Sequence, residues 1–148
     1  MLVYYIVVSA AIIYDSEKGF LLQQRSFDND FMPGAWAITG GKLERTEAGV
    51  DVLEENVIRE VAEEIGVTIG ELEYADSHMA VHDSVRRVFV IFLAKIISGV
   101  PHVVDPSEVA QIRWVSHDEL DEYKLPAAVR RALDKVCVRL GLLINKKI

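Results

Sequence analysis

The feature that most constrains the fold is one strong helical pattern, residues 52–65, set between long runs of strand-forming residues. Within it, apolar side chains recur at intervals of three and four, the spacing that places them on one side of a helix. The members of this stripe are Val57, Ile58, Val61, Ala62 and Ile65. Gly66 follows and suits the left-handed position that ends many helices. The pattern therefore predicts an amphipathic helix from Val52 to Ile65.

The opposite side of this helix carries three closely spaced glutamates, Glu60, Glu63 and Glu64. Glu60 and Glu64 lie one turn apart, and like charges at that spacing destabilise an isolated helix by roughly 0.2–0.5 kcal/mol. An arginine partner, open solvent or a bound cation can offset the repulsion. Arg59 can pair with Glu63, and solvated glutamate faces are common, so the helix alone leaves all three explanations open.

Strand-forming segments dominate the rest of the chain. They cover residues 3–14, 20–25, 35–39, 72–78, 85–97 and 112–115, and a turn at 15–19 joins the first two into a hairpin. A short helix is expected from Asp118, and an amphipathic helix over residues 127–143. Few helices among many strands predict an α+β fold, a mixed sheet sandwiched between helices. With no linker-like stretch, residues 1–148 are expected to form a single domain.

The charge and cysteine content of the chain indicate which ligands and which cellular environment suit it. The formal net charge of −7 argues against a nucleic-acid polymer, which is bound through a basic surface. A small phosphorylated ligand is compatible, because a metal ion can bridge acidic protein and acidic substrate. The apolar N-terminal run has no positive charge before it and is too short to span a bilayer, so we expect a strand and no membrane attachment. The single cysteine, Cys137, is expected to be buried and fits a cytoplasmic protein.

A glycine-rich segment, residues 40–44, precedes the helix. It favours a bound cation as the explanation for the clustered glutamates. Gly41 can expose a backbone carbonyl where a side chain would block approach, and Glu44 adds a carboxylate. Mg²⁺ prefers oxygen ligands, usually a few carboxylates completed by water and substrate phosphates. Zn²⁺ fits less well, because no histidine or cysteine lies nearby. The two segments together indicate a magnesium site.

The sequence from Gly40 to Val67 resembles the Nudix box, G-x5-E-x7-R-E-U-x-E-E-x-G-U, in which U is a bulky aliphatic residue. The residues that match are Gly41, Glu47, Arg59, Glu60, Val61, Glu63, Glu64, Gly66 and Val67. Segments outside the box, LLQQR, GAWAITGGK and IRWVSHDEL, are similar to those of MutT-like members. The resemblance implies the Nudix fold and an enzyme that hydrolyses a nucleoside diphosphate linked to another group.

The resemblance is interrupted in the loop before the helix. Glu47 precedes Arg59 by 12 positions, whereas the pattern separates the two residues by 8. Counting back from Arg59 places Asp51 at the first-glutamate position instead. In the family this glutamate supports the loop, so we expect a lengthened loop beside an intact site, with Glu47, Asp51 or neither in the supporting role.

The resemblance also implies roles for individual residues. Glu60, Glu63 and Glu64 would bind or organise Mg²⁺, for which Mn²⁺ can substitute. The Gly41 carbonyl would be a further ligand, and Glu44 would assist through water. Water attacks a phosphorus of the pyrophosphate, and the metal ions stabilise the attacking and leaving oxygens. Arg59 would orient the carboxylates through salt bridges.

The general base and the substrate contacts have more than one solution. The base is either Glu60 or Glu108, and Glu108, on a later loop, can equally be a metal ligand or a solvated carboxylate. Arg25 and Lys42 are placed to contact phosphates, although either can be a surface cation. Three aromatic residues ahead of the box can line a pocket for the nucleotide base: Phe27, Phe31 and Trp36. The last of these suits a core position as well.

Residues downstream of the box lack the markers of two other substrate classes of the family. ADP-ribose hydrolases of this family tend to carry a proline there, and dinucleoside polyphosphate hydrolases a tyrosine, where this chain has His82 and Asp83. The short chain resembles the MutT-like enzymes that cleave nucleoside triphosphates to a nucleoside monophosphate and pyrophosphate. The alternatives are hydrolysis of ADP-ribose or another nucleoside diphosphate derivative, and a non-catalytic nucleotide-binding module. A homodimer is compatible with the apolar first strand.

Overall fold

The first strand, β1 (Tyr5–Asp15), is the central strand of the sheet. In the computed structural model, which describes residues 1–142, seven strands form one sheet with the order β3-β2-β1-β6-β5, and β4 and β7 pair with β1 and β2. β1 runs parallel to β6 (Val85–Ser98) and antiparallel to β2 and β4. The valine and isoleucine side chains of β1 suit a strand that is covered on both faces.

The other strands pair along the two edges of β1, with β6 on one edge and β4 and β2 on the other. β5 (Thr68–His82) forms a long hairpin with β6, and β4 (Thr39–Lys42) pairs with the middle of β1. β2 (Gly19–Arg25) returns from β1 through a tight turn and pairs with β3 (Trp36–Ala37) and β7 (Val109–Val115). β1 thus changes partner along its length, from β4 to β2.

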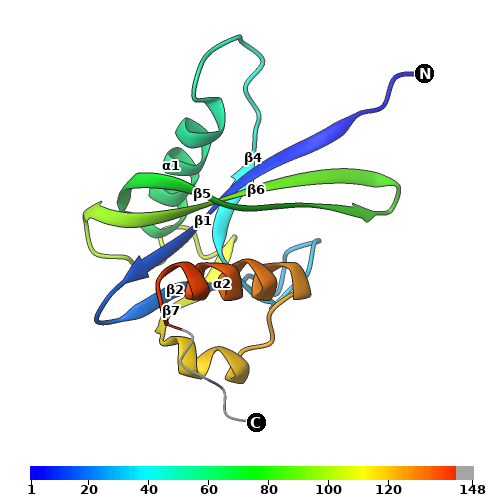
Figure 1. Ribbon diagram of the computed structural model, residues 1–148. Helices are drawn as coiled ribbons and strands as arrows, with labels where there is room; N and C mark the ends of the chain where they lie inside the picture. The colour runs from blue at the N-terminus through cyan, green and yellow to red at the C-terminus, as the bar shows by residue number, and fades with distance from the viewer. Residues whose placement is uncertain (143–148) are drawn as a thin grey trace.

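Alternate side chains of β1 enter two different cores. Ala11 and Ile13 pack with α1 (Val52–Ile65), whereas Ala10 and Ile12 pack with α2 (Ala127–Arg139). Successive side chains of a strand point to opposite faces, so the two helices cover opposite faces of the sheet (Figure 1). This arrangement confirms the predicted α+β fold with a mixed sheet between helices.

α1 has the bounds predicted from its apolar stripe, and Val57, Val61 and Ile65 are fully buried. Gly66 ends the helix at a φ of 71°, and a Cβ atom at this position would overlap the ring of His102. The chain bonds back to the helix end farther on, where the His102 N–H donates to the Ile65 carbonyl at 3.0 Å. The loop that follows, which carries Glu108, is thereby anchored at the end of α1.

Several boundaries differ from the sequence prediction. Residues 35–39 do not form one strand, because β3 pairs with β2 and β4 pairs with β1, and Gly40 and Gly41 lie inside β4. β5 is longer than predicted, since shifts of register between residues 68 and 76 hide its alternation. The first strand begins at Tyr5, the short helix is a 3-10 helix, η1 (His117–Glu122), and α2 ends at Arg139. The predicted end of the last helix, residue 143, lies outside the described residues.

The core next to α2 contains Cys137, which confirms that this thiol is buried. Burial raises the pKa of the thiol, which keeps it protonated. The apolar N-terminal run forms β1, as predicted. Within residues 1–142, no helix combines the length and the apolar character needed to cross a bilayer.

Candidate active site

A cavity of about 700 Å³ lies between α1, β4, β6 and the loops that follow β2 and precede β7. Its lining residues are Val8, Arg25, Asn29, Asp30, Phe31, Gly40, Gly41, Lys42, Glu44, Glu60, Glu63, Glu64, Arg87, Phe89, Asp105 and Glu108. The cavity therefore brings together all but three of the site residues chosen from the sequence. The three outside its lining are Phe27, Trp36 and Arg59.

Arg59 lies beside the cavity and holds two of the glutamates. Its guanidinium group pairs with Glu60 at 2.9 Å and with Glu63 at 2.9 Å. The hydrogen bonds that Arg59 donates to these carboxylates, above all to Glu63, raise the pKa of Arg59. Part of the repulsion along the helix is therefore offset by the arginine, which is one of the three explanations that the sequence left open.

Gly41 of β4 lies against the glutamate side of α1. A Cβ atom at this position would overlap the carboxyl group of Glu60, so any larger residue would push the carboxylate away. The Gly41 carbonyl accepts a hydrogen bond from the Asn56 side chain at 2.9 Å. Only glycine lets the strand and the carboxylate approach so closely.

Glu64 is a carboxylate on α1 whose charged form is disfavoured. Burial, together with the nearby charges of Glu60 and Glu108, raises its pKa to about 8. A hydrogen bond from Gln23 and the charge of Arg25 oppose that shift. One of its carboxyl oxygens, Oε2, is buried without a hydrogen-bond partner among residues 1–142. Burial also raises the pKa of Glu60, although Arg59 opposes the shift. Removing these negative charges from water without a cation is costly, so the arrangement fits a bound metal ion.

The geometry suits an ion that completes its coordination with other ligands. In the part of the chain that the structure describes, no three histidine, cysteine or carboxylate side chains form a ready-made metal cage. Mg²⁺ takes one or two carboxylates and fills its remaining positions with water and substrate phosphates. The unpartnered Glu64 oxygen, the Glu60 carboxylate and the cavity space beside them meet that requirement.

A second part of the cavity lining is cationic and aromatic. The guanidinium carbons of Arg25 and Arg87 lie 5.5 and 4.9 Å from the centre of the Phe31 ring. Arg25 also donates through Nε to the Phe31 carbonyl at 2.6 Å. Burial lowers the pKa of Arg25, and the charges of Glu108 and Glu64 oppose that shift. Contact with Phe31 holds two positive side chains close to the carboxylates, where phosphate groups can meet both.

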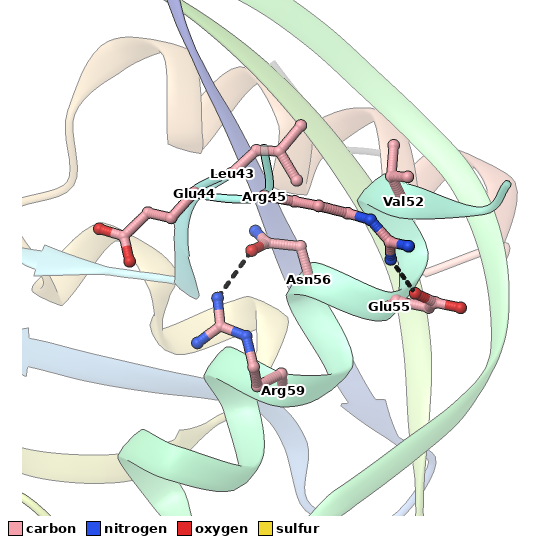
Figure 2. Close-up of a pocket in the computed structure, with 7 residues that line it drawn as sticks. All are labelled: Leu43, Glu44, Arg45, Val52, Glu55, Asn56 and Arg59. Atoms are coloured by element: carbon pink, nitrogen blue, oxygen red, sulfur yellow. Dashed lines mark hydrogen bonds and ion pairs between the residues drawn. The ribbon is translucent and has the colours of Figure 1, made fainter. Parts of the chain in front are cut away.

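The lengthened loop before α1 is held by Arg45. Figure 2 shows Arg45 reaching from the loop to Glu55 on α1, with which it pairs at 3.0 Å. The same guanidinium donates to the carbonyls of Glu47 and Ala48. Asp51 adopts a left-handed conformation at the helix start and makes no side-chain capping bond. Among the described residues, the side chains of Glu47 and Asp51 do not hold the loop. The carboxylate that does so is Glu55, through its ion pair with Arg45.

Two aromatic residues chosen from the sequence lie away from the cavity. Trp36 packs edge-on against Tyr123, with ring centroids 4.9 Å apart, at the core beside α2. Phe27 is 69% exposed, and its ring lies against Gly34. Neither is retained as a substrate contact.

Arg87, Phe89 and Asn56 were not chosen from the sequence, although signals for them exist. Arg87 and Phe89 are two residues apart in a strand, so they share one face. Asn56 lies one helical turn before Glu60 and is only 5% exposed. A polar residue beside the apolar stripe of α1 is the signal that could have found it.

The comparisons with known proteins agree with this geometry. The family model of the NUDIX domain matches residues 4–136. The chain is 27% identical over 132 residues to the nucleoside triphosphatase NudI of Klebsiella pneumoniae (strain 342). The matched region covers 83% of this chain and 91% of that protein. It is similar to the crystal structure of a MutT NUDIX hydrolase from Burkholderia pseudomallei, with a TM-score of 0.78, 27% identity and coverage of 90% and 98%. A MutT protein from Methanosarcina mazei Go1 gives a TM-score of 0.75 at 26% identity, with coverage of 92% and 95%.

The fold and the family model define a nucleotide hydrolase, and the chain belongs to the NUDIX family. It is a MutT-like Nudix pyrophosphohydrolase, an enzyme that cleaves the pyrophosphate linkage of a nucleotide. Nudix hydrolases generally use divalent metal ions, which agrees with the raised pKa of Glu64 on α1.

Proposed function

We propose that the protein hydrolyses nucleoside triphosphates to a nucleoside monophosphate and pyrophosphate, with Mg²⁺ as its metal ion and Mn²⁺ as a substitute. The observation that carries this proposal is the cavity in which the α1 carboxylates lie beside Arg25, Lys42 and Arg87. Phosphates need both kinds of group, metal-binding oxygens and direct cations. The relative named as a nucleoside triphosphatase supports the triphosphate over other nucleotides.

In this proposal Glu60, Glu63 and Glu64 hold Mg²⁺, the Gly41 carbonyl is a further ligand, and Glu44 contributes through water. When bound, the metal neutralises phosphate charge and stabilises the developing charge on the attacking and leaving oxygens. The buried, unpartnered oxygen of Glu64 supports its place among the ligands. Arg59 orients Glu60 and Glu63 through the two ion pairs.

Glu108 is the proposed general base. It lines the cavity and lies on the loop anchored at the end of α1. Glu60, the alternative, is held in an ion pair with Arg59 at 2.9 Å and is itself a proposed metal ligand. Glu108→Gln should therefore lower kcat while Mn²⁺ affinity is retained. Loss of Mn²⁺ affinity in this variant would make Glu108 a metal ligand instead.

The test is a product analysis on the purified protein. The protein is incubated with Mg²⁺ and a panel of canonical and oxidised nucleoside triphosphates, ADP-ribose, sugar nucleotides and dinucleoside polyphosphates, and products are identified by mass. We expect monophosphate and pyrophosphate from triphosphates, with turnover lost in EDTA and in Glu64→Gln. Glu54→Gln is the matched control, because it makes the same change on the same helix outside the cavity lining.

Each other outcome contradicts the proposal in a specific way. Turnover of ADP-ribose or another diphosphate derivative alone would replace the substrate class. Binding of nucleotide without turnover of any compound would indicate a non-catalytic module. Equal loss of activity in Glu54→Gln and Glu64→Gln would remove Glu64 from the site.

A further inference from the structure

Asn56 is a buried polar side chain that joins three parts of the active site. It lies in α1 one turn before Glu60 and is 5% exposed. Its Nδ2 donates to the Ser9 hydroxyl of β1 at 2.8 Å and to the Gly41 carbonyl of β4 at 2.9 Å. Its Oδ1 accepts from Arg59 at 2.8 Å, the contact drawn in Figure 2.

The chemistry of these partners fixes the orientation of the amide. The Gly41 carbonyl can only accept a hydrogen bond and the Arg59 guanidinium can only donate one, so rotating the amide by 180° would oppose both. Both N–H bonds of the amide are used. Burying an amide is costly unless it is hydrogen-bonded, and here the bonds offset the cost on both sides of the group.

We propose that Asn56 is a positioning residue that sets the active-site geometry, because it fixes β4 and Arg59 relative to the glutamates. Gly41 lies in contact with Glu60, and Arg59 pairs with Glu60 and Glu63. One side chain thus determines how far the glycine strand lies from α1 and where the guanidinium points. Asn56 touches no substrate or metal in this account, and the inference rests on the proposed metal site.

The test separates positioning from simple core packing by measuring Mn²⁺ affinity and stability together. Asn56→Asp keeps the size of the side chain and the oxygen that faces Arg59, but it places a second acceptor against the Gly41 carbonyl. Ser9→Ala is the control. It removes the hydroxyl that accepts a hydrogen bond from the Asn56 amide, and Ser9 is itself fully buried. Mn²⁺ binding without nucleotide is measured from the spin-resonance signal of the free ion, and stability from urea unfolding.

We expect Asn56→Asp to weaken Mn²⁺ binding by about 10–100-fold, the usual cost of losing a group that orients metal ligands. Ser9→Ala should leave Mn²⁺ affinity unchanged while lowering stability. If Asn56→Asp does not fold, Asn56→Leu keeps a similar side-chain volume in the core and removes all three hydrogen bonds of the amide. Wild-type affinity in the Asn56 variant, or equal loss of affinity in Ser9→Ala, would overturn the inference.

The outcome also separates this inference from the proposed function. A wild-type protein that binds Mn²⁺ but hydrolyses no nucleotide contradicts the function, and the comparison of Asn56 with Ser9 still decides the positioning role. A wild-type protein that binds no Mn²⁺ contradicts both.

Discussion

Two acidic side chains in this protein, Asp76 on β5 and Glu64 on α1, have opposite electrostatic surroundings: the pKa of Asp76 is lowered and that of Glu64 is raised. Asp76 is 3% exposed and forms ion pairs with two residues of α2, Arg131 at 2.8 Å and Lys135 at 2.9 Å. Burial alone would raise its pKa, but hydrogen bonds from Lys135 and Ser77 and the charge of Arg131 lower it. Burial and like charges raise the pKa of Glu64 to about 8, and one of its oxygens has no partner among residues 1–142.

The difference supports a structural role for Asp76 and the proposed metal-binding role for Glu64. The bonds of Asp76 join β5 to α2 and leave its charge satisfied inside the protein. In the proposed function, a divalent cation from outside the chain satisfies the negative charge of Glu64. Strongly perturbed carboxylates in a cavity mark functional sites for this reason.

The largest expected effect comes from removing each charge in turn. Glu64→Gln should lower kcat/KM at least about 100-fold, because a metal ligand is lost. It should also raise the metal-free unfolding free energy, since it relieves repulsion at the site. Asp76→Asn should do the reverse, with activity retained and stability lowered by about 2 kcal/mol, a discounted figure because its cationic partners are half-exposed. Steady-state kinetics and urea unfolding check both, and matching effects in the two variants would erase the distinction.

Metal binding should stabilise the protein through Glu64 and should not depend on Asp76. At about 100 times the dissociation constant, Mg²⁺ adds about 2.7 kcal/mol to the unfolding free energy, because it binds the folded state alone. The gain should vanish in Glu64→Gln and persist in Asp76→Asn. Thermal unfolding with Mg²⁺ and with EDTA measures it, and a full gain in Glu64→Gln would contradict the account.

The two carboxylates should also give opposite slopes of stability against pH. In metal-free buffer the folded state keeps a proton on Glu64 that the unfolded chain releases, so this contribution is lost as pH rises from about 4.5 to about 8. Asp76 contributes above its ordinary pKa of 3.8, and that contribution is lost as pH falls through its lowered folded value. Urea unfolding across pH should show a decline above pH 4.5 that is absent in Glu64→Gln.

A smaller effect is expected from a comparison of two arginines. Arg87→Ala should raise KM for a nucleoside triphosphate about 10-fold with little change in stability, because in the proposed function its charge contacts a substrate phosphate. Arg131→Ala should cost about 1 kcal/mol of stability and leave KM unchanged, since its charge serves Asp76. An unchanged KM in Arg87→Ala would remove this residue from the substrate site.

The part of the site that could be predicted from sequence lies on one helix. The spacing of Arg59, Glu60, Glu63 and Glu64 fixes their common side, because helical geometry is local. Gly66 predicted the helix end for the same reason. The fold class followed from the strand-rich pattern with few helices.

The residues that sequence reasoning missed depend on contacts between distant segments. Arg87 faces the cavity because β6 pairs in parallel with β1, a register that no local pattern specifies. Trp36 lies away from the cavity because Tyr123, far along the chain, packs against it. The pairing of Arg45 with Glu55 likewise exists only once the lengthened loop folds onto α1.

A metal-binding role for Glu64 can be tested most directly by its pKa, measured by following its carboxyl carbon by NMR across pH. We expect a pKa of about 8 without metal and a large decrease when Mg²⁺ is added, because the cation favours the charged carboxylate. A pKa near the ordinary 4.5 in metal-free protein, or one that Mg²⁺ leaves unchanged, would contradict the claim that this carboxylate is left for a cation.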